Sequence, residues 1–106
     1  MPRPLGETLM SEQLTFQPGD RPALSPMFLL RWEKTQDAHV LLYPEGVIKL
    51  NGSAAEILKR CTGENTVAGM VDELKTVFVD VAADEIENGI NRFLETAHAK
   101  GWIRSR

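Results

Sequence analysis

The fold is decided by residues 39–50, which read HVLLYPEGVIKL. Two short apolar runs of strand-forming residues, His39–Tyr43 and Val47–Leu50, flank the break PEG at 44–46. A proline presets φ for the second position of a turn, and a glycine accepts positive φ at the exit. This stretch therefore predicts a tight hairpin between two antiparallel strands.

A third strand is expected before the hairpin. Residues 28–33 read FLLRWE, and Phe28, Leu30 and Trp32 fall on one side of an alternating pattern. Alternation with a period of two is typical of a half-buried strand. Because only a short polar break at 35–38 separates this strand from the hairpin, the three strands are expected to form an antiparallel meander.

After Asn51 the apolar residues recur at the spacing of amphipathic helices. Asn51 and Ser53 are expected to cap the first helix, where Ser53 has the Ser-x-x-Glu spacing of a capping box. Thr66 is the expected cap of a second helix, and a third is expected to open at Asp84 and stop at Gly101. The three apolar stripes are Ala54, Ile57, Leu58 and Cys61; Val67, Met70, Val71, Leu74 and Phe78; and Ile86, Ile90, Phe93, Leu94 and Ala97.

Strands that precede the helices, rather than alternate with them, predict an α+β fold. We expect a winged-helix-like domain over residues 27–104, with a three-stranded antiparallel sheet followed by three α-helices. Residues 1–26 contain five prolines and only scattered apolar residues. They are therefore expected to form an extended or disordered N-terminal arm.

The composition indicates one ordinary domain in a reducing compartment. The chain has 106 residues, of which 42% are apolar and 25% are charged, and its formal net charge is −3. No run approaches the ~18–20 apolar residues that span a bilayer, so no membrane partner is expected. The first ten residues lack the apolar run of a secretory signal. Since Cys61 is the only cysteine, an intramolecular disulfide is excluded, and a cytoplasmic location is expected.

The sequence shows no recognisable pattern of enzyme chemistry. No glycine-rich phosphate loop, nucleophile elbow or pair of carboxylates stands out. His39 and His98 lie far apart without metal-ligand spacing, and Cys61 falls on an apolar stripe without a base nearby in sequence. We therefore expect a protein with no catalytic activity, no metal and no cofactor.

A winged-helix DNA-binding transcriptional regulator is the alternative that the architecture alone suggests. Its recognition helix would be residues 84–100, which carry four acidic residues against Arg92 and Lys100, a net charge of −2. A phosphate backbone would repel such a helix more than attract it. Nucleic acid is therefore disfavoured as a partner.

The hairpin and the helix after it resemble a known family. Residues 41–51, LLYPEGVIKLN, and residues 53–58, SAAEIL, are similar to the pyrroloquinoline quinone (PQQ) biosynthesis protein D family, PqqD. The resemblance covers roughly residues 24–104. It implies a peptide chaperone that binds the ribosomal precursor peptide of the cofactor and presents it to a radical S-adenosylmethionine (radical SAM) enzyme. The oligomeric state, monomer or homodimer, stays open. Further similar features are Gly63, the Thr66-Val67 helix start and the closing Gly101-Trp102-Ile103.

The resemblance also implies a binding site. In such modules the leader segment of the peptide adds as a strand to the third strand of the sheet and lies against the third helix. An edge strand leaves backbone N–H and C=O groups unpaired, and an incoming extended peptide satisfies them. Which alternate side chains of the strand face the core, and which flank of the helix borders the peptide, stays open. The candidate residues are Val47, Ile48, Lys49 and Leu50 on the strand, and Ile86, Ile90, Asn91, Phe93, Leu94 and Ala97 on the helix.

Overall fold

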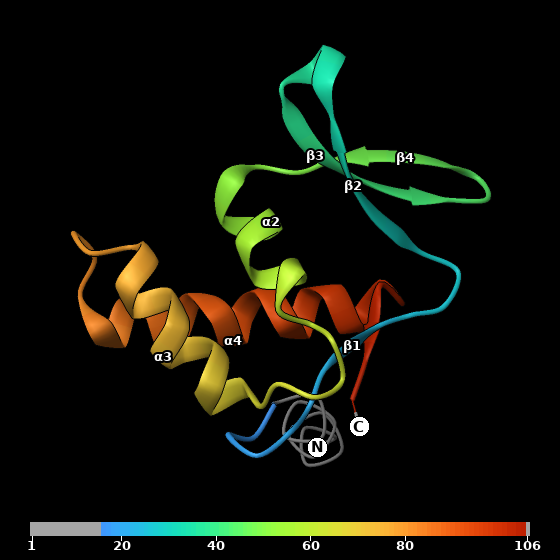
Figure 1. Ribbon diagram of the computed structural model, residues 1–106. Helices are drawn as coiled ribbons and strands as arrows, with labels where there is room; N and C mark the ends of the chain where they lie inside the picture. The colour runs from blue at the N-terminus through green and yellow to red at the C-terminus, as the bar shows by residue number, and fades with distance from the viewer. Residues whose placement is uncertain (1–15, 106) are drawn as a thin grey trace, which may run out of the picture.

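A small antiparallel sheet is joined to three helices in the computed structural model, which describes residues 16–105 (Figure 1). In chain order the elements are β1 (Ala23–Leu24), β2 (Leu29–Glu33), the short 3-10 helix η1 (Lys34–Gln36), β3 (Ala38–Tyr43), β4 (Gly46–Lys49), α2 (Gly52–Lys59), α3 (Val67–Val77), α4 (Ala83–Ala99) and β5 (Ile103–Arg104). The main sheet has the order β2-β3-β4, and a second, two-stranded sheet pairs β1 with β5. The expected α+β class, with a three-stranded sheet followed by three helices, is confirmed.

The hairpin forms where the sequence predicts it, although its glycine serves another purpose. Tyr43 pairs with Gly46 across the turn, and the register continues to Val40 opposite Lys49. The expected positive φ at Gly46 is wrong. Its missing side chain provides space instead, because an added Cβ would lie 3.3 Å from the Tyr43 hydroxyl oxygen. The Tyr43 ring stacks on Phe28 with their centroids 5.4 Å apart, so Gly46 leaves room for an aromatic pair.

The predicted helix caps at Asn51 and Thr66 are present, whereas the predicted cap at Ser53 is wrong. The Asn51 side chain accepts a hydrogen bond from the Ala54 N–H at 2.8 Å, which satisfies a free donor in the first turn of α2. Because α2 begins directly after Asn51, Ser53 lies inside the helix and its hydroxyl donates to Asn51 at 3.1 Å, so the Ser53 capping box does not form. Thr66 caps α3 by accepting from the Gly69 N–H at 3.1 Å.

The core lies among the helices and against one face of the sheet. Figure 1 shows α2 standing between the sheet and α4, and the apolar stripes of all three helices are largely buried. Leu41 on β3, Met70 and Leu74 on α3, and Leu94 on α4 have no exposed surface. Removing such side chains from water supplies most of the stability of a domain of this size. None of the helices within residues 16–105 is long and apolar enough to cross a membrane.

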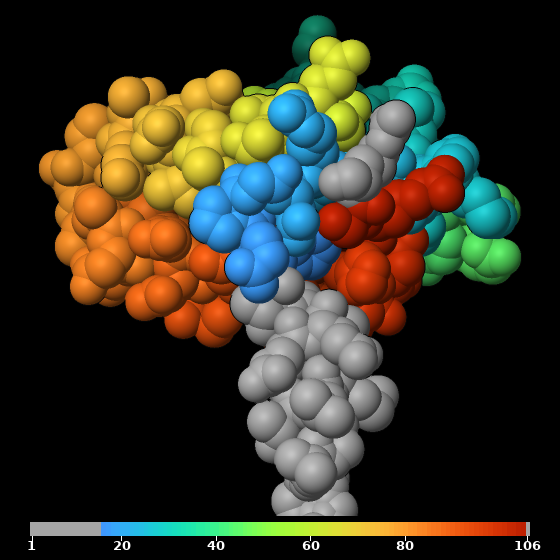
Figure 2. All heavy atoms as spheres, turned by 90° about the horizontal axis from the view of Figure 1, so that it is seen from below, coloured from blue at the N-terminus to red at the C-terminus, as the bar shows by residue number. Residues whose placement is uncertain are grey.

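The packed part of the chain starts earlier than expected, which corrects the boundary at Met27. Phe16 is only 6% exposed, and its ring meets the His98 ring on α4 edge-on, with the centroids 5.6 Å apart. The backbone C=O groups of Pro18 and Asp20 accept the first N–H groups of α3 at 3.0 and 2.9 Å. Figure 2 shows this segment, in blue, seated against α3, α4 and the C-terminal end. Residues 1–15 of the expected arm lie outside the described residues.

The β1–β5 pair joins this early segment to the end of the chain. Ala23 lies opposite Arg104, and Leu24 lies opposite Ile103. Gly101, with a φ of 80°, follows the end of α4 as expected and turns the backbone toward β1. Ile103 is thereby buried to 2% exposure, so both ends of the described chain are fixed to the core.

Candidate functional site

The outer edge of β4 offers backbone groups that no strand pairs. Within the described residues, β4 has β3 on one side and no strand on the other. The Leu50 N–H donates to the His39 C=O at 3.0 Å, which marks this antiparallel pair as hydrogen-bonded. Hydrogen-bonded and non-hydrogen-bonded pairs alternate along an antiparallel ladder. The backbone N–H and C=O groups of Ile48, which lies opposite Leu41, therefore also face β3. The N–H and C=O groups of Val47 and Lys49 therefore point away from the sheet.

The burial of the β4 side chains shows which of them face the core. Leu50 is buried and Ile48 is half-buried against the core. Val47 is 62% exposed, and Lys49 is exposed as well. Because side chains alternate along a strand, Ile48 and Leu50 lie on the inner face of the sheet, and Val47 and Lys49 lie on the outer face. The strand thus offers its backbone at the edge and one half-buried apolar side chain toward the helices.

An apolar hollow of about 340 Å³ begins where β4 ends. It lies between the start of α2 and one flank of α4, and the link between α3 and α4 closes its far end. Gly89 lies in the wall formed by α4, and a Cβ added there would meet no atom within 4 Å. Glu85 is the one charged residue of the lining. The lining residues are Asn51, Ser53, Ala54, Ile57, Phe78, Val81, Glu85, Ile86, Gly89, Ile90 and Phe93.

The candidate residues on the third helix separate into three groups. Ile86, Ile90 and Phe93 line the hollow together. Leu94 and Ala97 have no exposed surface and lie in the core beneath this wall. They are buried because α4 packs against its neighbours along the centre of its apolar stripe, not along the margin.

Asn91 lies on the other flank of α4, away from the hollow. It lines a separate depression together with Phe16, Val67 and Val71, where the early segment crosses α3 and α4. It therefore does not line the hollow that Ile90 lines. A helix turns by about 100° per residue, so neighbours in sequence face different sides. The flank that borders the hollow is the one that carries Gly89 and Phe93.

The sequence pattern does not predict the other walls of the hollow. Ile57 and the Asn51 cap come from α2, and Phe78 and Val81 come from the link before α4. These residues meet only in the tertiary structure. One local signal did exist: Gly89 stands in the interior of a helix, where a glycine is unfavourable unless a close approach requires it.

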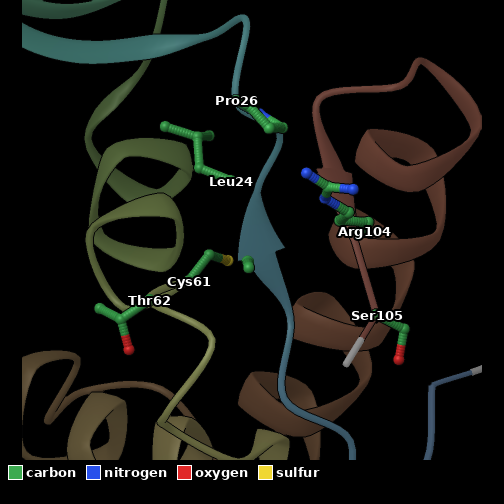
Figure 3. A pocket seen from close by; sticks show the side chains of 7 residues that line it. Leu24, Pro26, Cys61, Thr62, Arg104 and Ser105 are labelled. Atoms are coloured by element: carbon green, nitrogen blue, oxygen red, sulfur yellow. The ribbon is translucent and has the colours of Figure 1, made fainter.

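A second hollow, on the side of the β1–β5 pair, contains the single cysteine (Figure 3). Cys61 is 4% exposed there, and its thiol donates to the Ile57 C=O at 3.4 Å. Burial raises the pKa of the Cys61 thiol to about 12, so the thiol stays protonated at neutral pH and is a poor nucleophile. Within residues 16–105 no three His, Cys, Asp or Glu side chains gather where they could hold a metal ion.

These features define a class of domain, an α+β module in which the edge strand that leads into the helices, β4, is followed by an apolar hollow between helices. The family model described as "Coenzyme PQQ synthesis protein D (PqqD)" matches residues 38–103. This range contains β3, β4, all three helices and the hollow. The chain belongs to the PqqD family.

Curated relatives and a solved structure agree with this assignment. A PqqA binding protein of Methylococcus capsulatus is 40% identical over 91 residues, which cover 86% of this chain and 95% of the relative. A PqqA binding protein of Pseudomonas paraeruginosa is 49% identical over 82 residues, which cover 77% of this chain and 87% of the relative.

The solved structure is the solution NMR structure of the PqqD truncation of Methylobacterium extorquens PqqCD. It represents a functional, stand-alone recognition element for ribosomally synthesized and post-translationally modified peptides. It superimposes on this chain with a TM-score of 0.71 at 30% sequence identity. The superposition covers 88% of this chain and 98% of the Methylobacterium chain.

Proposed function

We propose that this protein binds the precursor peptide PqqA as an added strand on β4 and presents it to the radical SAM enzyme of PQQ biosynthesis. The observation that carries the proposal is the open edge of β4, together with the apolar hollow whose lining starts at Asn51, two residues after β4 ends. The names of the relatives, which are PqqA binding proteins, and of the Methylobacterium recognition element support the choice of ligand.

Backbone pairing supplies the part of the affinity that does not depend on peptide sequence. The outward N–H and C=O groups of Val47 and Lys49 provide two donors and two acceptors to an extended chain. Each such hydrogen bond contributes about 0.5–1.5 kcal/mol net. Four of them contribute about 2–6 kcal/mol, before the entropy cost of ordering the peptide is subtracted.

The apolar hollow supplies the part of the affinity that does depend on peptide sequence. The inward side chains of an added strand extend the inner face of the sheet beyond Ile48 and lie toward Phe93 and Ile90. An apolar side chain in the hollow fixes the register of the peptide, because a shift by one residue would turn it to the outer face. Leu94 and Ala97 support this wall from beneath.

Delivery follows from holding the peptide on a second protein. A carrier that binds both the peptide and the modifying enzyme raises the local concentration of the reactive segment at the active site. The carrier itself then needs no reactive group in the site. This division of tasks matches the residues of the hollow, which are mostly apolar.

Proline substitutions on β4 test strand addition directly. Val47→Pro removes an N–H that points out of the sheet, so the sheet should stay folded while peptide binding weakens by at least about fivefold, the loss of roughly 1 kcal/mol. Ile48→Pro is the matched control, since it removes a donor directed at β3 and should unfold the hairpin itself. Circular dichroism measures folding and calorimetry measures the affinity for PqqA. A folded Val47→Pro variant with unchanged affinity would place the binding site elsewhere.

A further inference from the structure

A second apolar surface lies on the outer face of the sheet, which is turned away from the helices. Leu29, Leu42 and Val47 lie directly opposite one another on the three strands and form one row, here named the outer row. The adjacent row of Leu30, Leu41 and Ile48 faces the core, so alternation places the outer row on the opposite face. Leu29 is 57% exposed and Val47 is 62% exposed.

Two cations stand beside the outer row. Arg31 and Lys49 are exposed and lie on either side of Val40, in the next row of the same face. Neither of them pairs with a carboxylate within residues 16–105. Glu33 is the one acidic residue that the strands β2, β3 and β4 place on this face. In a chain with a net charge of −3, this face is therefore locally positive.

The outer row is continuous with the edge where the peptide is proposed to add. Val47 contributes its side chain to the row and its backbone groups to the edge of β4. A guest strand on β4 would extend the outer row with its own outward side chains, because the pleat continues across a sheet. A protein seated on this face would touch the carrier and the peptide together.

We propose that the outer row is the docking surface for the enzyme that receives the peptide. The enzyme would contact it with an apolar patch of its own that has carboxylates beside it. The proposal rests on the proposed function, since it needs a partner that acts on the guest peptide. The apolar row supplies the centre of the contact, and Arg31 and Lys49 supply complementary charge at its rim. Because the row is complete only when the peptide is bound, the loaded carrier binds the enzyme more tightly than the empty one.

Substitutions on β2 test this surface without touching the peptide edge, because β3 separates β2 from β4. Leu29→Asp places a charge in the centre of the row, and Arg31→Glu reverses a rim charge. With purified PqqA and the purified radical SAM enzyme as probes, the affinity of Leu29→Asp for the enzyme should fall about tenfold or more. Arg31→Glu should weaken the complex most at low salt, since rim charges are screened. Peptide affinity should stay within about twofold of the unchanged protein for both variants.

Val79→Asp is the matched control for the outer row. Val79 is 73% exposed in the link between α3 and α4, so it is an equally accessible apolar residue elsewhere on the molecule. Its substitution should leave enzyme binding unchanged. If Leu29→Asp unfolds, Arg31→Glu still decides the test, because it replaces one exposed charged side chain by another.

Three outcomes are distinguishable. Normal enzyme binding by folded Leu29→Asp and Arg31→Glu variants overturns the docking surface but leaves peptide binding intact. A wild-type chain that sediments as a dimer, and a Leu29→Asp variant that sediments as a monomer, would assign the outer row to a second copy and overturn the proposal in favour of self-association. A wild-type chain that binds no PqqA overturns the proposed function itself.

Discussion

Filling the hollow from its α4 wall separates peptide binding from folding. At Gly89 an added Cβ meets no atom within 4 Å, and the position lies within α4 and lines the hollow. Gly89→Leu therefore places a side chain in the space that the peptide is expected to occupy. Glycine is about 0.8–1.0 kcal/mol less favourable than alanine inside a helix, and leucine is close to alanine. The substitution should thus raise the free energy of unfolding by about 1 kcal/mol while it closes the site.

The expected sizes of the two effects follow from this geometry. For a domain of this length, 1 kcal/mol corresponds to a rise in Tm of about 4–8 °C. Burying one aliphatic side chain of the peptide is worth about 1.5–3 kcal/mol, so its exclusion should raise the Kd for PqqA roughly ten- to hundredfold. Differential scanning calorimetry and isothermal titration calorimetry measure the two quantities on the same protein. Few substitutions on this chain should make it more stable and less able to bind.

Gly89→Ala is the control that isolates helix propensity. It should raise Tm by a similar amount, and its single methyl group should leave most of the hollow open, so PqqA affinity should change little. If Gly89→Leu raised Tm and left the affinity for PqqA unchanged, the peptide would not occupy the hollow, and the reasoning from Ile86, Ile90 and Phe93 would be refuted.

Three further predictions concern the packing of the fold. Asn51→Ala should lower the free energy of unfolding, measured in urea, by about 1 kcal/mol, because it removes the cap of α2. Ser53→Ala should change it by less than about 0.5 kcal/mol, and equal losses for the two variants would contradict the cap assignment. Phe16→Ala should cost about 3 kcal/mol in the same assay, because the ring is buried, and a loss near zero would return this segment to an unpacked arm. Cys61 should react slowly with a thiol reagent at pH 8 in the folded protein and rapidly in urea, because its pKa is about 12 when buried; rapid labelling of the folded chain would show an exposed thiol.

Elements with local causes could be predicted from the sequence. The hairpin depends on a short link between two apolar runs, and it forms at the expected residues. Thr66 stands directly before the second apolar stripe, and it caps α3 as expected. Asn51 and Ser53 are both good caps two residues apart, so the sequence could not choose between them. In the structure Asn51 is the cap, because α2 begins at Gly52 and Ser53 therefore lies inside its first turn.

Elements with distant causes could not be predicted in the same way. The pairing of Ala23 with Arg104 joins residues from opposite ends of the chain, and no local pattern announces it. The helical period of α4 selects Ile86, Ile90 and Phe93 as candidates, and these three residues line the hollow. It could not separate them from Leu94 and Ala97, because the choice between margin and centre of an apolar stripe depends on how the neighbouring helices pack.

The β1–β5 pair has a practical consequence for experiments with this protein. In Figure 1, β1 and β5 lie below the right-hand end of α4, whereas β4 lies above it. A fluorophore, an affinity handle or a sensor chip attached after β5 therefore leaves the molecule on the side remote from the sheet. Immobilised in that orientation, the protein presents the open edge of β4 to the solution, where newly translated peptides can be captured and then identified by mass spectrometry.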